Sequence, residues 1–162
     1  MNPENTMTMP TLWNALYWTW AASITAAIWI GKAHAPTMFG GANWIGIVSV
    51  AILAAALAIR WTAIVTLGKS FSVNVAIHAT QTLYKTGLYR LVRHPSYTGL
   101  LLVFVAIGLH TRNWVGLAIM LIPPGAALLY RIRVEEAALG QAFGQEYTDC
   151  SKATKRLLPG VY

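Results

Sequence analysis

Charged residues and cysteine are rare in this sequence. Only 10% of its 162 residues are charged and 56% are hydrophobic, whereas about a quarter of the residues in soluble domains are charged. The single cysteine, Cys150, excludes an intramolecular disulfide, so the segment around it need not face an oxidising compartment. Such a chain is suited to an apolar solvent, and its length predicts one domain, residues 1–162.

Acidic residues are especially scarce, with five Asp and Glu against twelve Lys and Arg, which gives a formal net charge of +7. An excess of basic residues can indicate binding to nucleic acid or to a membrane surface. In a hydrophobic chain whose basic residues fall in a few loops, orientation in a membrane explains them better. Membrane lipids are therefore expected partners, and nucleic acid is not.

Four segments are apolar enough to be considered as membrane spans, at about residues 12–31, 44–67, 97–110 and 114–130. The first is uncharged and is too long and too rich in tryptophan for a signal peptide, so a retained helix is expected. The second continues past Arg60 if that arginine faces protein or reaches the interface. These segments predict an all-α integral membrane protein with about four transmembrane helices.

The third and fourth segments form a predicted helical hairpin. The third is shorter than the roughly 20 residues that a span normally needs, which suits a helix buried against protein. A tight turn is expected at Thr111-Arg112-Asn113. The fourth contains Pro123-Pro124-Gly125, which should kink or break it because two prolines remove two helix donors. From Arg131 to Tyr147 the chain is expected to form a helix that emerges into water.

The basic residues are distributed unequally between the two sides of this four-span arrangement. Only Lys32 and Arg112 fall on one side. The other side carries Arg60, Lys69, Lys85, Arg90, Arg93, Arg131, Arg133, Lys152, Lys155 and Arg156. Because cytoplasmic loops carry an excess of Lys and Arg, both termini and the polar segment of residues 69–96 are predicted to be cytoplasmic.

The polar segment leads into the third span through the run from Gly87 to Gly99. An arginine, a histidine and two tyrosines lie within nine residues there, at a helix start whose free backbone donors can hold an anionic group. The same residue types are ordinary at a membrane boundary, where Pro95 would start the helix and Tyr97 would anchor it. From the residues alone, a ligand site and a juxtamembrane loop both remain open. Arg93 has two candidate roles, a carboxylate contact or a headgroup anchor.

A second polar cluster, Arg131 to Glu136, follows the fourth span. Arg131 and Glu135 are four residues apart and share a helical face. They could form a surface ion pair of small energetic value. A glutamate that accepts from an ammonium, one turn from an arginine that holds a carboxylate, would equally suit a site for a zwitterion or for two ligands. The residues alone favour neither the surface ion pair nor the ligand site.

Together, these motifs resemble the isoprenylcysteine carboxyl methyltransferase family, membrane enzymes that use S-adenosylmethionine. The shared pattern is Gly-x-Tyr-Arg-x-x-Arg-His-Pro-x-Tyr-x-Gly, a hydrophobic hairpin, then Glu-Glu-x-x-Leu and Phe-Gly-x-x-Tyr. The matching residues are Gly87, Tyr89, Arg90, Arg93, His94, Pro95, Tyr97, Gly99, Glu135, Glu136, Leu139, Phe143, Gly144 and Tyr147. The final Leu158-Pro159-Gly160 also resembles the family's ending, so the resemblance extends roughly from Arg60 to the C-terminus.

The resemblance implies that S-adenosyl-L-methionine is the cofactor. It would be bound within about residues 74–162, where the helical hairpin and a cytoplasmic C-terminal helix complete the pocket. By position, the cofactor-binding residues would be Gln81, Thr82, Leu83, Tyr84, Tyr89, His94, Pro95, Ser96, Tyr97 and Glu135. Arg131 would bind the carboxylate of a lipophilic substrate that arrives from the bilayer.

Carboxyl methylation asks the protein mainly for positioning. A sulfonium methyl is already activated and a carboxylate is already a nucleophile at neutral pH, so no dedicated general base is needed. Most of the rate would come from alignment of donor and acceptor in a site shielded from water. No catalytic residue and no metal are therefore expected.

Two other functions remain open at this stage. Phospholipid methyltransferases resemble this family in their paired glutamates, so the acceptor could be the amine of a phospholipid or of another small lipophilic molecule. An amine must lose a proton, which would favour a nearby base and would leave Arg131 without an obvious partner. The chain could also be a membrane scaffold or lipid-binding protein without enzymatic activity.

Overall fold

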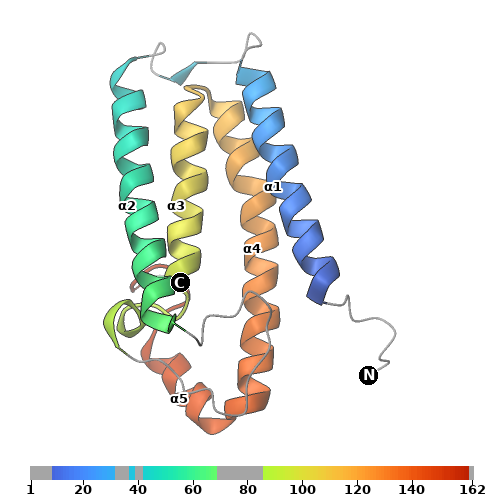
Figure 1. Ribbon diagram of the computed structural model, residues 1–162, viewed down its shortest axis with the longest axis vertical. Coiled ribbons are helices and arrows are strands. Elements are labelled where there is room, and N and C mark those ends of the chain that lie inside the picture. The colour runs from blue at the N-terminus through green and yellow to red at the C-terminus, as the bar shows by residue number, and fades with distance from the viewer. Residues whose placement is uncertain (1–8, 32–36, 39–41, 69–85, 161–162) are drawn as a thin grey trace.

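The described part of the protein forms four long helices and two short ones. A computed structural model describes residues 9–31, 37–38, 42–68 and 86–160. The elements in chain order are α1 (Met9–Gly31), α2 (Trp44–Leu67), the 3-10 helix η4 (Gly87–Arg90), α3 (Pro95–His110), α4 (Trp114–Phe143) and α5 (Gln145–Ala153). The long helices lie side by side, and η4 and α5 lie together at one end of the bundle (Figure 1). In the described ranges the helical elements match the predicted all-α class.

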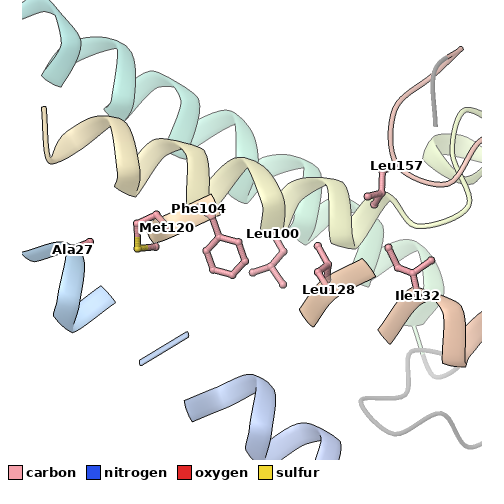
Figure 2. Packing of buried hydrophobic residues seen from close by; sticks show 7 residues of the cluster. All are labelled: Ala27, Leu100, Phe104, Met120, Leu128, Ile132 and Leu157. Atoms are coloured by element: carbon pink, nitrogen blue, oxygen red, sulfur yellow. The ribbon is translucent and has the colours of Figure 1, made fainter. Parts of the chain in front are cut away.

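Helix α3 occupies the centre of the packing. It contacts α2 on one side and α4 on the other, and α1 packs against α4. The buried core follows these contacts (Figure 2) and consists of Ala27, Leu100, Phe104, Met120, Leu128, Ile132 and Leu157. Leu157 belongs to the C-terminal segment rather than to a long helix, so that segment is part of the core.

Two helices, α2 and α4, are long and apolar enough to cross a membrane, with mean hydropathies of 2.1 and 1.7. Helix α3 is apolar but has only 16 residues. Helices α1, α2 and α3 begin and end within three residues of the predicted segments, whereas α4 continues to Phe143. Among the described residues, two helices qualify as spans by length and composition. The outward face of α2 is apolar, as Trp44, Ile47, Trp61 and Val65 are all exposed, which suits contact with lipid.

Helix α2 continues past Arg60 because this arginine faces protein. Its Nη1 donates to the Ser96 carbonyl oxygen at 3.2 Å and approaches Ser96 Oγ at 3.4 Å. The close approach of α2 and α3 depends on Gly99, where an added Cβ would lie 2.9 Å from both the Ala56 carbonyl oxygen and the Arg60 nitrogen. The missing side chain therefore lets the two backbones touch beside the first turn of α3.

Helix α4 is not broken at Pro123-Pro124 and runs well beyond residue 130, to Phe143. The two prolines remove two donors, but Pro124 is fully buried and α1 and α3 pack against the helix. Packing from neighbouring helices can hold a proline-containing helix together. The expected single helix from Arg131 to Tyr147 is wrong at Gly144, whose φ of 51° ends α4 before α5 begins.

The predicted tight turn between α3 and α4 is present at the far end of the bundle. Asn113 is the N-cap of α4, and its Oδ1 accepts from Gly116 N at 2.5 Å. Arg112 has a positive φ of 55°, and its Nη1 donates to Asn43 Oδ1 at 3.0 Å. His110 Nδ1 lies 3.0 Å from Ser49 Oγ. These contacts tie the hairpin to α2.

A methyl group at Gly99 should destabilise the fold. Gly99→Ala places a Cβ against the α2 backbone, and overpacking of this kind costs about 1–3 kcal/mol. We expect a lower melting temperature for the detergent-solubilised variant, measured by circular dichroism. The matched control is Gly125→Ala, since an added Cβ there meets nothing within 4 Å. An unchanged melting temperature for Gly99→Ala would contradict the close approach.

Candidate functional site

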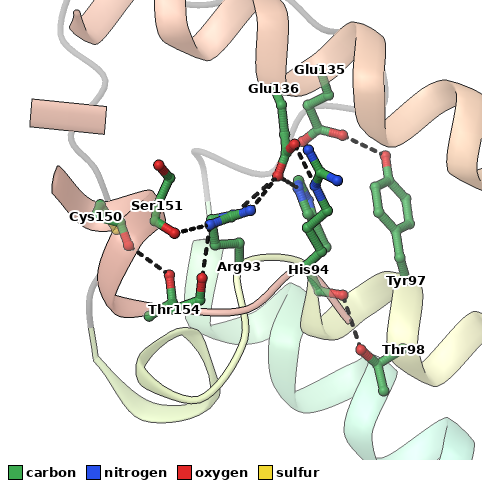
Figure 3. A network of polar contacts seen from close by, with 10 residues as sticks. Arg93, His94, Tyr97, Thr98, Glu135, Glu136, Cys150, Ser151 and Thr154 are labelled. Atoms are coloured by element: carbon green, nitrogen blue, oxygen red, sulfur yellow. Dashed lines mark hydrogen bonds and ion pairs between the residues drawn. The ribbon is translucent and has the colours of Figure 1, made fainter. Parts of the chain in front are cut away.

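The first turn of α3 meets the second half of α4 through the hydroxyl of Tyr97. Arg131 Nε donates to Tyr97 Oη at 2.5 Å, and Tyr97 Oη donates to Glu135 Oε2 at 2.7 Å. The Arg131 guanidinium carbon also lies 5.8 Å from the centre of the Tyr97 ring. Arg131 and Glu135 share one face of α4, as their spacing predicts, and Tyr97 joins them. Figure 3 shows Tyr97 directed toward Glu135.

His94 lies directly before this turn and is almost completely buried. Pro95 occupies the first helical position, and His94 has a non-helical backbone with φ −123° and ψ 60°. The imidazole stacks on the Tyr97 ring with a centroid distance of 5.5 Å and an interplanar angle of 26°. Its Nε2 lies 3.5 Å from Glu136 Oε1, which is an electrostatic contact rather than a well-formed hydrogen bond.

Tyr89 reaches the same region from η4. Its hydroxyl donates to the Ala63 carbonyl oxygen of α2 at 3.2 Å. Burial raises the pKa of Tyr89, and the nearby Glu135 carboxylate raises this pKa further. The phenol therefore stays protonated at neutral pH and can act as a hydrogen-bond donor.

Glu136, next to Glu135, binds two arginines. Its Oε1 accepts from Arg93 Nε at 3.0 Å and lies 2.9 Å from Arg93 Nη2, while its Oε2 accepts from Arg156 Nε at 2.7 Å. We call this group of Arg93, Glu136 and Arg156 the latch, because it joins the segment directly before α3, helix α4 and the C-terminal segment. The Arg93 and Glu136 side chains are only 12% and 11% exposed. This pair is therefore shielded from water, which strengthens its attraction.

The C-terminal segment runs across the start of α3. Arg93 Nη1 donates to the carbonyl oxygens of Ser151 and Thr154 at 2.6 and 2.8 Å, near the end of α5 (Figure 3). Backbone bonds continue the contact, from Arg93 N to the Lys155 carbonyl at 2.8 Å and from His94 N to the Arg156 carbonyl at 3.0 Å. Residues 151–157 are thus held against the Arg-His-Pro motif.

Tyr147 of α5 lies at the other side of the latch and is buried. Burial raises the pKa of Tyr147, and the Glu136 carboxylate raises it further. The phenol is therefore neutral at physiological pH.

A match to a model of a known protein family identifies the family of this chain. The model described as the "Isoprenylcysteine carboxyl methyltransferase (ICMT) family" matches residues 47–141, which is more than half of the chain. The chain belongs to the isoprenylcysteine carboxyl methyltransferase family. The matched range contains the Arg-His-Pro motif, the hairpin and both glutamates.

Named relatives agree with this family. The chain is 33% identical over 132 residues to a "Probable protein-S-isoprenylcysteine O-methyltransferase" of Oryza sativa subsp. indica, covering 74% of this chain and 62% of the relative. It is 30% identical over 131 residues to "Protein-S-isoprenylcysteine O-methyltransferase B" of Arabidopsis thaliana, covering 73% and 61%. The chain therefore spans about three fifths of the length of these relatives.

The fold is similar to that of a solved membrane enzyme. The structure of the eukaryotic intramembrane Ras methyltransferase ICMT (isoprenylcysteine carboxyl methyltransferase) matches 97% of this chain and 55% of its own, with a TM-score of 0.65 and 22% identity. This likeness concerns the fold. Together with the family and the apolar helices, it identifies the chain as a membrane protein.

The structure brings most of the described, family-implied residues to one place. His94, Tyr97, Arg131 and Glu135 are connected by the contacts above. Tyr89 is near enough for the Glu135 carboxylate to raise its pKa, but its hydroxyl donates to Ala63. Two further residues lie in the same turn, since Pro95 is buried at its start and Ser96 accepts from α2 through its carbonyl oxygen. The predicted loop Gln81, Thr82, Leu83 and Tyr84 lies outside the described residues.

Three features of the site were missed from the sequence. Arg93 was expected to hold a carboxylate or a headgroup, but it binds Glu136 and the C-terminal segment within the protein. Arg60 contacts the first turn of α3 through Ser96. The docking of the C-terminal segment was also missed, although its apolar Leu157 in a basic tail was a possible signal.

Removal of the Tyr97 hydroxyl should weaken the contact between α3 and α4. Tyr97→Phe leaves Arg131 and Glu135 without their shared partner, and loss of a partner for a buried charged group costs about 1–3 kcal/mol. We expect a lower melting temperature in detergent than for the wild type. Tyr130→Phe, at a hydroxyl on the half-exposed face of α4, is the matched control and should have little effect. Equal melting temperatures for the two variants would refute the bridging role.

Proposed function

We propose that this protein transfers a methyl group from S-adenosylmethionine to the carboxylate of a lipophilic acceptor, of the isoprenylcysteine type. The observation that carries the proposal is the bonded series Arg131, Tyr97 and Glu135, which places a cation and an anion on one helical face. The family and the names of the relatives support the reaction class. The proposed activity needs two charged ligands side by side, and this site offers one group for each.

Glu135 fits the cofactor because, within the described part of the chain, only one of its carboxylate oxygens accepts a hydrogen bond. Its Oε2 accepts from Tyr97, and no described residue donates to its Oε1. That oxygen can accept from an α-ammonium or a ribose hydroxyl. When bound, the cofactor supplies a methyl group that its positive sulfur has already activated. His94, stacked on Tyr97, and the neutral Tyr89 would form the adjoining wall.

Arg131 fits the acceptor, because a planar guanidinium matches a carboxylate in geometry and charge. Arg60 adds a second cation from α2, where it donates to the Ser96 carbonyl oxygen in the first turn of α3. Two arginines against the single carboxylate of Glu135 leave a local positive charge. An anionic acceptor would neutralise this charge, which favours a carboxylate over an amine.

The reaction would depend on positioning. Tyr97 holds Arg131 and Glu135 through one hydroxyl, so the groups proposed for acceptor and donor are fixed relative to each other. Fixed geometry converts an encounter of two molecules into an internal reaction, which can supply about 7–11 kcal/mol of the barrier. Burial of His94 and of Arg131 is consistent with a site that excludes water.

The membrane would deliver the acceptor, and the cytoplasm the cofactor. The excess of basic residues at the end of the bundle with η4 and α5 supports a cytoplasmic position for this end and for both termini. Membrane lipids would surround the exposed apolar faces. We propose that the acceptor reaches Arg131 from the bilayer side.

Binding of S-adenosylhomocysteine tests the cofactor assignment. We expect the purified wild type to bind it in calorimetry, and Glu135→Ala and His94→Ala to bind at least about tenfold more weakly, since hydrogen bonds to charged groups are worth about 1.5–3 kcal/mol. Arg131→Ala should retain binding. The exposed Arg133→Ala is the control for loss of an arginine on α4. Absence of binding by the wild type would reject the proposed function.

Methylation assays with labelled cofactor test the acceptor. The wild type should methylate a prenylated cysteine acid and leave amine lipids unmodified. Arg131→Ala should lose turnover, and Arg60→Gln should raise the KM for the acid about tenfold or more, while both still bind S-adenosylhomocysteine. Methylation of amine lipids but of no acid would establish the phospholipid-type alternative. Cofactor binding without methylation of either class would favour a binding protein.

A further inference from the structure

The latch connects the C-terminal segment to the proposed cofactor site without itself belonging to that site. Arg93 binds the last turn of α5, and Arg156 lies three residues beyond the end of that helix. Arg93 donates to Oε1 of Glu136, and Arg156 donates to Oε2 of the same carboxylate. Among the described residues, Glu136 is thus the carboxylate that binds both arginines and joins this segment to α4.

A continuous path leads from Glu136 to Glu135. Glu136 Oε1 contacts His94 Nε2, and the His94 ring stacks on Tyr97, whose hydroxyl donates to Glu135. The backbone of His94 is fixed at the same time, because its N–H donates to the carbonyl oxygen of Arg156. Any displacement of the segment therefore acts on the histidine that forms a wall of the proposed site.

We propose that Glu136 is a positioning residue, which makes docking of the C-terminal segment and binding of the cofactor stabilise each other. This inference rests on the proposed function. Glu136 touches neither donor nor acceptor in it, and acts through Arg93, His94 and Arg156. Coupling of this kind is reciprocal, so a docked segment raises cofactor affinity by the same factor as cofactor raises the docked population.

The charges explain why Glu136 has this position. Without the Glu136 carboxylate, the nearly buried Arg93 and the partly exposed Arg156 would be two cations close together without the anion that now binds both. Removal of one partner of a buried ion cluster is far more costly than loss of a surface pair. Glu136→Gln keeps the size of the side chain and removes the negative charge, so it should release Arg156 and the end of α5.

The only cysteine of the chain provides a direct measure of this release. Cys150 lies on α5, partly buried, and lines a cavity of about 600 Å³ together with Tyr89 and Arg90 of η4. In the detergent-solubilised full-length wild type, we expect a thiol reagent to label Cys150 slowly, and S-adenosylhomocysteine to slow it further. Glu136→Gln should label about tenfold faster or more.

Calorimetry gives the reciprocal measurement. Glu136→Gln should bind S-adenosylhomocysteine about tenfold or more weakly than the wild type. Gly108→Ala is the control for simple destabilisation: an added Cβ meets Leu117 Cα at 3.0 Å, at the far end of the hairpin. It should lower the melting temperature without changing cofactor affinity or Cys150 labelling. Arg93→Lys keeps the positive charge but removes the planar guanidinium with its several donors. It should weaken cofactor binding and speed Cys150 labelling less than Glu136→Gln does.

The outcomes separate this inference from the proposed function. Wild-type binding, with unchanged affinity and labelling in Glu136→Gln, would overturn the inference alone. Faster labelling with unchanged affinity would also overturn it, because Glu136 would then have only a structural role. No binding by the wild type would overturn the proposed function and the coupling together. Parallel changes in labelling and affinity, absent from Gly108→Ala, are the result expected.

Discussion

The pairing of charges in an apolar protein is the constraint on which this structure depends. The chain has five acidic residues for twelve Lys and Arg, so few carboxylates are available to balance arginines away from water. Glu135 and Glu136 stand next to each other on α4 and serve different partners. Glu136 neutralises the latch arginines, and Glu135 is bonded through Tyr97 to Arg131. The ends of α3 and α4 and the C-terminal segment are placed by these pairings as much as by apolar packing.

This division of tasks explains why the two glutamates are not equivalent. Both oxygens of Glu136 are occupied by side chains of the protein, which suits a structural anchor. One oxygen of Glu135 accepts from the Tyr97 hydroxyl, an arrangement that suits contact between the other oxygen and a ligand. Adjacent positions on a helix point about 100° apart, so one residue can face the tail while its neighbour faces α3. A paired-glutamate motif can thus combine stability with binding.

Local sequence patterns were sufficient to predict the helices and part of the site. Long apolar runs predicted α1, α2 and α4, and the four-residue spacing of Arg131 and Glu135 correctly placed them on one face. The continuity of α4 through Pro123-Pro124 was not predictable, because it depends on packing by neighbouring helices. Local rules describe what a segment prefers alone, and tertiary contacts overrode that preference here.

The missed site residues share one physical cause. Arg93 and Arg60 find their partners 43 and 36 residues away, and no periodicity in the sequence reports contacts at that separation. The motif itself was visible, and its resemblance to a family supplied roles for several residues. Composition gave the tail of residues 148–162 a basic character, whereas the structure gives it a buried leucine and a series of backbone bonds to α3.

The shared location of Arg131 and Glu135 on one continuous helix has a geometric consequence. Four residues of α-helix advance by about 6 Å along the axis, so the backbone itself sets the separation between the two charged groups. Thermal motion of α4 carries both together and hardly alters this interval. Adaptation to ligands of other lengths or shapes would therefore have to occur in the surrounding walls, since a longer or shorter interval is not available without breaking the helix.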